Sequence, residues 1–311
     1  MSHLHFGRPL SSGNLLLSLR VAPFFRIAPL AMLAYRHAFH AGNHADVLKH
    51  ITLMLLLRHM NAKDKSYRYI DTHAGAGGYS LEGQYAQKKG EYEKGIGRLW
   101  AREGLPTVVS DYLELVQRFN PDGALNQYPG SPALAQMMIR GQDQMRLFEM
   151  HPTDHRILTS FMAEAPGVTV YRADGFEGLK GQVPPSSRRA LVLMDPSYEG
   201  HADYLKVVTS LRAAIERFST GVYMVWYPQV QKLEAAQLPK RLQALAPKSW
   251  LHARLTVQQP DSQGFGLAGS GVFIINPPHT LHAELQALLP VLTETLAQYD
   301  GANHFLAQHA V

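Results

Sequence analysis

The sequence of 311 residues contains no cysteine. This absence excludes disulfide bonds, thiolate-ligated metal sites, iron–sulfur clusters and every mechanism that uses a cysteine nucleophile. Because disulfides are rare in the cytoplasm, we expect a cytoplasmic protein. The hydrophobic fraction of 46% and the charged fraction of 18% are those of a globular protein with a large core, which excludes a mainly disordered chain.

The sequence also lacks a strong excess of charge of either sign. It has 30 Lys and Arg against 25 Asp and Glu, a net charge of +5. Three cations lie in residues 1–31, which contain no acid, so the rest of the chain carries 27 cations against 25 acids, a net charge of +2. Binding to a polyanion such as a nucleic acid would therefore depend on local groups of charge.

A long apolar run is missing as well. Residues 1–31 are apolar, but Arg20 and Arg26 interrupt any run near the ~18 residues that a membrane-spanning helix needs, so no transmembrane segment is predicted. This segment has three interpretations: a targeting sequence, a folded extension, or a leader before a start at Met32. We favour the third and place the predicted folded domain in residues 32–311.

Apolar runs that end at polar residues alternate with helical patterns along the chain. The spacing of Val47 and Ile51 predicts a helix over residues 45–60, with Asn43 as its N-cap. Strands are predicted at residues 67–70, 145–148, 168–172, 190–194, 221–226, 251–257 and 271–275. This alternation predicts an α/β fold with a doubly wound parallel sheet of about seven strands, which binds ligands beyond the carboxyl ends of its strands.

One connection is too long for this pattern. Asp71 and Glu149, at the ends of the first two strands, are 78 residues apart, whereas the next two such distances are 25 and 21 residues. Because a strand with its crossover takes ~30 residues, about 45 residues are surplus. Helical patterns at residues 90–102 and 108–119 predict a small helical subdomain inserted at residues 81–127.

Acidic residues end four of the predicted strands: Asp71, Glu149, Asp174 and Asp195. The loop after the first strand, G-A-G-G at residues 75–78, lacks the full G-x-G-x-x-G that receives a dinucleotide pyrophosphate. It suits S-adenosylmethionine better, because Glu149 can accept from both ribose hydroxyls and Asp174 from the adenine amino group. In the alternative interpretation, both acids are exposed strand-end residues without a ligand.

The last of these acids begins the tetrad Asp195-Pro196-Ser197-Tyr198. An adenine amino group is a poor nucleophile because its lone pair is delocalised into the ring. The Asp195 carboxylate and the Pro196 carbonyl can accept hydrogen bonds from the two N–H groups of this amino group. Tyr198 can stack on an unpaired base. The tetrad therefore predicts direct methyl transfer to a flipped-out adenine, unless it is an ordinary turn after a strand. The lack of cysteine agrees, because methylation at a pyrimidine C5 commonly proceeds through a cysteine adduct.

A second tetrad, Asn276-Pro277-Pro278-His279, matches an N-P-P-aromatic pattern more closely at its prolines. It follows the last predicted strand, away from the strand that lies next to the transferred methyl group. We therefore do not expect it to be catalytic.

Histidines are concentrated between residues 35 and 50, at positions 37, 40, 44 and 50. We favour a segment that contacts cofactor, base and phosphate. A metal-dependent hydrolase site that includes Asp46, or a capped helix with incidental histidines, are the alternatives. No metal-ligand spacing is present, so we expect no metal.

Several motifs together point to a family: residues 32–50, D-T-H-A-G-A-G at 71–77, Y-P-G-S-P at 128–132, A-D-G at 173–175 and W-Y-P at 226–228. They closely resemble the bacterial RlmJ family of 23S rRNA adenine-N6 methyltransferases, over about 280 residues from Met32 to near the C-terminus. The resemblance implies a Rossmann-like fold, S-adenosylmethionine as cofactor, and methylation of adenine 2030 in protein-free or early ribosomal RNA. It also implies that the family's enzymes begin at the position of Met32.

The resemblance also assigns roles to individual residues. The cofactor contacts would be His50, His73, Ser131, Glu149, Asp174, Gly175 and Asp195. Asp195 would also be the catalytic residue, and the substrate contacts would be Tyr35, Pro196 and Tyr198. Lys49 is a further candidate for the cofactor's carboxylate. Ser131 has a local interpretation too, as the cap of the helix that follows it.

The chain departs from the family's D-P-P-Y pattern at Ser197. Both predicted acceptors and Tyr198 remain, but one fixed φ angle is lost, so we expect a looser loop that keeps its activity. Two alternatives stand beside an rRNA methyltransferase: a DNA adenine-N6 methyltransferase, which shares the tetrad, and a catalytically silent RNA-binding protein that keeps the cofactor pocket.

The expected partner is 23S rRNA, with no membrane contact, no obligate protein partner and a monomeric state. Its target adenine must be unstacked to enter the pocket. Candidate phosphate contacts are Arg36, Arg188, Arg189 and the basic residues of the insertion, Lys88, Lys89, Lys94 and Arg98.

Overall fold

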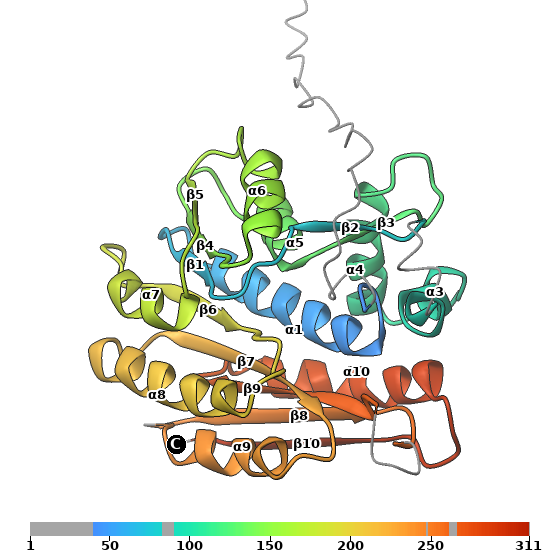
Figure 1. Ribbon diagram of the computed structural model, residues 1–311. Coiled ribbons are helices and arrows are strands. Elements are labelled where there is room, and N and C mark those ends of the chain that lie inside the picture. Colours follow the sequence, from blue (N-terminus) through green and yellow to red (C-terminus); the bar gives the residue numbers. More distant parts are fainter. Residues whose placement is uncertain (1–39, 83–89, 247, 261–265, 311) are drawn as a thin grey trace, which may run out of the picture. The chain divides into compact units, whose positions relative to one another are not determined.

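An eight-stranded sheet forms the centre of the molecule (Figure 1). The computed structural model describes residues 40–82, 90–246, 248–260 and 266–310. The strand order is β5-β4-β1-β6-β7-β9-β8-β10. The strands are β1 (Arg68–Asp71), β4 (Gln144–Phe148), β5 (Val168–Tyr171), β6 (Ala190–Met194), β7 (Val222–Gln229), β8 (Trp250–Thr256), β9 (Gly269–Ile275) and β10 (Asn303–His309).

The sheet has a parallel part and an antiparallel part. Strands β5, β4, β1, β6 and β7 are parallel, whereas β9, β8 and β10 each run antiparallel to their neighbours. All seven predicted strands are present, and the Rossmann-like α/β class is confirmed. The predicted number of strands is one too low for this sheet, because β10 is an edge strand whose residues are mostly polar and exposed, without a buried apolar run.

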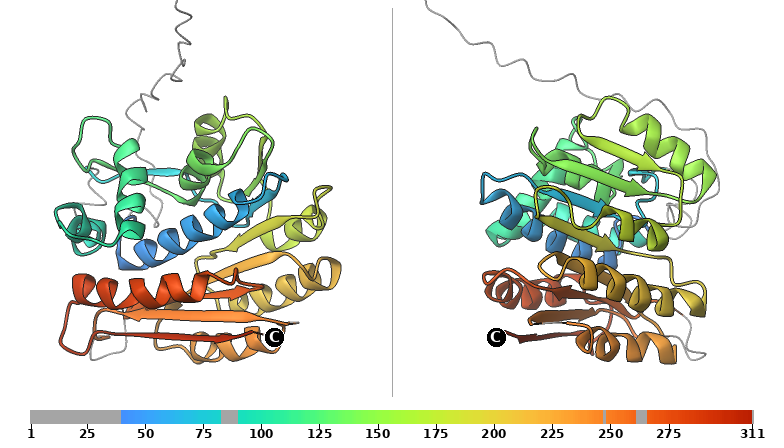
Figure 2. Two further views of the ribbon diagram at one scale, coloured as in Figure 1. Left: turned by 180° about the vertical axis from the view of Figure 1, so that it is seen from behind. Right: turned by 90° about the vertical axis from the view of Figure 1, so that its left-hand side faces the viewer.

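Helices cover both faces of the sheet (Figure 2). In β6, Leu191 and Leu193 pack into one hydrophobic cluster, while Val192 and Met194 pack into the other, because successive side chains of a strand point to opposite faces. The first cluster includes residues of α1 (His44–Asn61), α4 (Thr107–Arg118), α5 (Ser131–Met138), α6 (Pro152–Phe161) and α10 (Leu281–Leu296). The second includes residues of α7 (Gly175–Gln182), α8 (His201–Arg217) and α9 (Leu233–Gln243).

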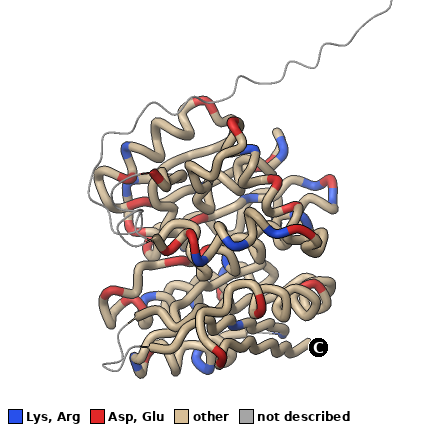
Figure 3. Tube along the Cα trace, turned by 90° about the vertical axis from the view of Figure 1, so that its right-hand side faces the viewer, with Lys and Arg blue, Asp and Glu red and all other residues tan. Residues whose placement is uncertain are grey.

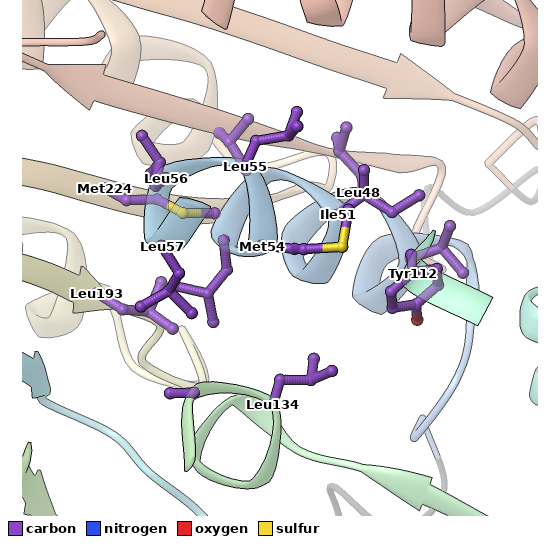
Figure 4. Packing of buried hydrophobic residues seen from close by; sticks show 14 of the residues in the cluster. Leu48, Ile51, Met54, Leu55, Leu56, Leu57, Tyr112, Leu134, Leu193 and Met224 are labelled. Atoms are coloured by element: carbon purple, nitrogen blue, oxygen red, sulfur yellow. The ribbon is translucent and has the colours of Figure 1, made fainter. Parts of the chain in front are cut away.

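Helix α1 is buried on nearly all sides (Figure 4). Its predicted N-cap is confirmed, since the Asn43 side chain accepts hydrogen bonds from the backbone N–H groups of Ala45 and Asp46. Apolar residues surround the helix and meet α4, α5, α10 and the strands. Because nearly the whole helix is buried, its polar residues Asp46, Lys49 and His50 are enclosed by the core.

The long connection between β1 and β4 contains both helices and strands. The helical patterns correspond to a 3₁₀ helix, η2 (Glu91–Lys94), followed by α3 (Ile96–Trp100) and α4. A two-stranded antiparallel sheet of β2 (Gly78–Ser80) and β3 (Gln127–Pro129), which the sequence did not predict, closes this segment. Its treatment as a subdomain at residues 81–127 stays a prediction.

Within the described part of the chain, every helix is too short or too polar to cross a bilayer. The predicted leader at residues 1–31, Met32 and the substrate candidate Tyr35 lie outside the described residues.

Candidate active site

The carboxyl ends of the parallel strands border a cavity of about 990 Å³. Every predicted site residue that the structure describes lines it: His50, His73, Ser131, Glu149, Asp174, Gly175, Asp195, Pro196 and Tyr198. These residues come from six separate segments of the chain. The cavity lies where a doubly wound sheet binds its ligands, at the switch point between β1 and β6.

A buried lysine connects the cavity to helix α1. Lys49 Nζ lies 2.6 Å from Asp195 Oδ2 and 2.7 Å from Asp46 Oδ1, and its side chain is 4% exposed. Burial alone lowers the pKa of Lys49, but the two carboxylates outweigh that effect and raise it, so the lysine stays charged. Asp46 is itself fixed by the backbone N–H of Gly42, at 2.9 Å. The ammonium group proposed for the cofactor's carboxylate is therefore held at Asp195.

The loop after β6 is anchored at Tyr198. Its hydroxyl donates to the Trp226 carbonyl at 2.7 Å, and Lys232 Nζ donates to the Tyr198 carbonyl at 3.2 Å. Its φ of 53° is in the left-handed region, and its ring lies 4.6 Å from that of Tyr204. Burial raises the pKa of Tyr198 well above its ordinary value, so the hydroxyl remains a donor. Tyr198 thus fixes the loop, and its contact with a base stays a prediction.

Trp226 is a cavity residue for which the sequence suggested no role. It comes from β7, lines the cavity and is partly exposed, and Lys49 Nζ lies 5.6 Å from the centre of its ring. The W-Y-P motif at residues 226–228 marked this position without indicating where the side chain lies. Trp226 supplies an aromatic surface beside Asp195.

Glu149 and Asp174 are held by backbone N–H groups. Glu149 Oε2 accepts from Gly75 at 2.8 Å and its Oε1 accepts from His151 at 2.7 Å. Asp174 is the N-cap of α7, where its Oδ1 accepts from the Phe176 N–H at 2.8 Å. Neither acid is merely an exposed strand-end residue, because both are oriented at the cavity wall.

The start of α7 packs tightly against the end of β1. A Cβ atom on Gly175 would lie 1.9 Å from the Thr72 carbonyl oxygen, so a larger residue cannot fit without movement of the backbone. The neighbouring His73 ring lies edge-on to Phe176, at 4.5 Å. Burial lowers the pKa of His73 to about 4, although Asp195 and Asp174 oppose this, so the imidazole is neutral at pH 7.

Asp71, at the end of β1, is the centre of a buried hydrogen-bond network. Its Oδ2 accepts from Tyr69 at 2.8 Å and from Ser131 at 2.7 Å, and its Oδ1 accepts from the His73 N–H. Burial raises the pKa of Asp71 to about 6. The predicted capping role of Ser131 is wrong: Gly130 is the N-cap of α5, and the Ser131 hydroxyl is directed to Asp71 instead.

Comparison with known proteins identifies the family of this chain. Residues 64–306 match the family model of the ribosomal RNA large subunit methyltransferase D, RlmJ. The ribosomal RNA large subunit methyltransferase J of Escherichia coli is 43% identical over 88% of this chain and 97% of its own, and that of Haemophilus influenzae is 44% identical over 85% and 94%. This chain belongs to the RlmJ family.

A solved structure supports the same relationship. A crystal structure of a Legionella pneumophila protein has 34% identity and a TM-score of 0.80, and the match covers 87% of this chain and 98% of that one. The fold is therefore shared, over most of the chain, with an experimentally observed protein.

The second tetrad lies on the other side of this RlmJ-family fold. Since β9 runs antiparallel to β7, Asn276 follows Ile275 at the amino end of β7, beside Tyr223. Its side-chain N–H groups donate to the carbonyls of Ser219 and Gly221. The expectation that this tetrad is not catalytic agrees with its position, because Asp195 lies at the opposite edge of the sheet.

The described histidines near the start of α1 have separate surroundings. His40 Nδ1 lies 2.8 Å from Glu91 Oε2, and His50 Nδ1 lies 2.8 Å from the Tyr128 hydroxyl. Among the described residues, no group of three or more His, Asp or Glu side chains could hold a metal ion. These positions do not support the hydrolase alternative.

Two of the four described RNA candidates are engaged elsewhere. Arg189 donates to the carbonyls of Met60 and Lys65 at the amino end of β6, and Arg98 donates to the carbonyls of Thr295 and Ala297. In Figure 3, basic and acidic residues alternate along the visible trace without forming one large basic region. Lys94 differs, because it lines a small cavity that shares residues with the large one.

Proposed function

We propose that this RlmJ-family protein uses S-adenosylmethionine to methylate N6 of an adenine in 23S rRNA, at the position of adenine 2030. The names of its relatives support an action on the RNA of the large ribosomal subunit. The observation that carries the reaction type is the buried Lys49–Asp195 contact at the carboxyl end of β6, beside the cradle of Glu149 and Asp174. Asp195 and Pro196 lie next to that cradle in one cavity.

The cradle fits the cofactor. A carboxylate has about four acceptor positions, and two backbone N–H groups use one on each oxygen of Glu149, so two remain for a ribose diol. Asp174 Oδ2 faces Lys206 at 3.5 Å and can accept from an adenine amino group. Gly175 lets the backbone of α7 approach β1 closely, which brings Asp174 to the cavity. The cofactor supplies an electrophilic methyl group when it is bound.

The residues around Asp195 bind and orient the amino group of the substrate. Lys49 donates to Oδ2 of the Asp195 carboxylate, and Oδ1 can accept a hydrogen bond from one N–H group of the adenine. The Pro196 carbonyl can accept the second. The Asp195 carboxylate can stabilise the positive charge that develops on N6 and accept its proton after transfer. Trp226 offers an aromatic surface on which the flipped-out base can stack.

Methyl transfer to an unmodified fragment of 23S rRNA tests this function. The purified protein should transfer a labelled methyl group to one adenine, and mapping of the modified nucleotide should give N6-methyladenine at the position of adenine 2030. An equimolar DNA fragment of the same sequence should not compete. Preferential transfer to DNA would establish the DNA methyltransferase instead. Calorimetric cofactor binding without transfer to any RNA would establish a silent RNA-binding protein.

A further inference from the structure

A second cavity, of about 210 Å³, adjoins the active-site cavity. The two share His40, Asn43 and Leu267 in their walls. The small cavity is formed where the start of α1 meets η2 and the segments that follow β8 and α10. This shared wall makes the small cavity a candidate site for a unit that neighbours the one bound at Asp195 in a polymeric ligand.

His44 lines this cavity and has a buried ring nitrogen without a hydrogen-bond partner. It is the first residue of α1, it is 5% exposed, and its Nε2 has no hydrogen-bond partner. Burial lowers the pKa of His44 to about 4, so the ring is neutral and Nε2 can serve as a donor or an acceptor, depending on its tautomer. A buried polar atom without a partner costs stability, and a ligand that hydrogen-bonds to it would recover that cost.

Two glutamine side chains and a lysine complete the polar lining. Gln258 Nε2 donates to the Leu267 carbonyl at 2.7 Å, which fixes its amide group. Gln298 is held beside it, because its backbone N–H donates to the Val257 carbonyl at 2.7 Å. Lys94 adds a positive charge at an exposed position. Amide and imidazole groups hydrogen-bond the edges of unstacked bases, and lysine contacts phosphate.

The chemistry of the lining favours a nucleotide over an acidic peptide. Glu91 lies in the wall, where His40 and Asn43 hold its Oε2, and its negative charge would repel a carboxylate side chain. A base has both donors and acceptors on its edge, so it can satisfy His44 and the amides without burying a negative charge. The phosphate can remain outside, near Lys94.

We propose that this small cavity binds the base of a nucleotide adjacent to the target adenine, with His44 and Gln298 contacting the base and Lys94 its phosphate. This inference rests on the proposed rRNA function and names the part of the protein that selects the RNA sequence around the methylated base.

A substrate–variant cycle tests the proposal. The substrates are the intact rRNA fragment and fragments in which the nucleotide on the 5′ or the 3′ side of the target carries no base. For the wild-type protein, removal of one of these bases should lower kcat/KM ~10-fold or more. Gln298→Ala and His44→Ala should lower kcat/KM on the intact fragment to a similar degree. For each variant, kcat/KM on the abasic fragment should then equal its value on the intact fragment. Lys94→Ala should weaken RNA binding and reduce its salt dependence on both fragments equally.

Lys240→Ala on α9 is the matched control for charge, because Lys240 is exposed and lines neither cavity. Gln298→Ala keeps the test valid if His44→Ala fails to fold. Equal wild-type kcat/KM on intact and abasic fragments would overturn the proposal. So would a Gln298 variant in which the loss from the substitution and the loss from base removal multiply. Fluorescence anisotropy gives the dissociation constants of the same variants for the same fragments, so the comparison can be made for binding without catalysis. A failure of wild-type transfer with a preserved binding cycle would contradict the proposed function and support the cavity.

Discussion

The carboxyl ends and the amino ends of the parallel strands, called here the carboxyl edge and the amino edge of the sheet, each carry a similar tetrad. The two tetrads have different roles. At the carboxyl edge, Asp195 follows β6 and its side chain meets Lys49, which comes from a helix 146 residues earlier in the chain. At the amino edge, Asn276 follows β9 and its side chain donates to two backbone carbonyls nearby. One edge collects side chains that can act on a ligand, whereas the other uses polar groups to satisfy the backbone.

The difference also affects two buried aspartates. Asp71, at the carboxyl edge, lies among neutral hydroxyl donors, and burial raises its pKa to about 6. Asp143, immediately before β4 at the amino edge, is also buried, but hydrogen bonds from Arg140 overcome the effect of burial and hold its pKa below the ordinary value. Two acids with little exposed surface thus have pKa values shifted in opposite directions.

The largest effect should come from removing Asp195. Asp195→Ala should lower kcat for methyl transfer ~10²–10³-fold, because one preorganised acceptor for the developing charge is lost. Asn276→Ala should leave kcat of the folded protein unchanged. Steady-state assays on the rRNA fragment, with circular dichroism to confirm folding, check both. Wild-type turnover in the Asp195 variant would refute its catalytic role and the distinction between the two edges.

The aspartates should respond to pH with opposite signs. The folded protein binds the Asp71 proton more tightly than the unfolded chain does, so the stabilisation is complete below pH ~4 and is lost as pH rises through 6. The free energy of unfolding of the wild type minus that of Asp71→Asn should therefore fall by about 2 kcal/mol between pH 4 and pH 7. Urea unfolding at several pH values measures it.

Asp143→Asn is the matched comparison. The pKa of Asp143 is lowered in the folded state, so its stabilisation is present above pH ~4 and is lost as pH falls. The corresponding difference for Asp143→Asn should rise with pH. If this free-energy difference had the same pH dependence for both aspartates, their partners would not shift the two pKa values in opposite directions.

A smaller effect is expected at Asn276. Asn276→Ala removes two hydrogen bonds and places alanine at a φ of 55°, so it should destabilise the protein by ~1–3 kcal/mol. Asn276→Gly removes the same bonds without the strain and should cost less. Thermal unfolding of the two variants separates the contributions, and equal losses would mean that backbone strain is unimportant here.

Much of this architecture could be predicted from the sequence, because it depends on local patterns. Buried strands such as β6 are continuous apolar runs, and the acids that follow them mark the carboxyl edge. Strand β10 was missed because an exposed edge strand carries no such run. The direction of β9 could not be predicted either, although it decides which tetrad reaches the cavity.

The contacts within the site were less predictable. A lysine on the buried helix α1 is an indication that Lys49 has a buried acidic partner, but nothing local identifies Asp195 as that partner. Ser131 was expected to bond its own helix because capping is a local rule, and a buried acid from β1 takes its hydroxyl instead. Tyr198 is at the predicted place, but its orientation depends on β7, which comes later in the chain.

The smallest effect should come from replacing Ser197 with proline, which would complete the D-P-P-Y pattern. The loop beyond Ser197 is already fixed by the Tyr198 hydroxyl on Trp226 and by Lys232 on the Tyr198 carbonyl. Ser197→Pro should therefore change kcat by less than ~2-fold and stabilise the protein by at most ~1 kcal/mol, through reduced freedom of the unfolded chain. Tyr198→Phe, which removes one anchor, should lower kcat more than Ser197→Pro changes it. A large gain of activity in Ser197→Pro would show instead that the serine loosens the carboxyl edge, and that these two contacts are not enough to position Asp195.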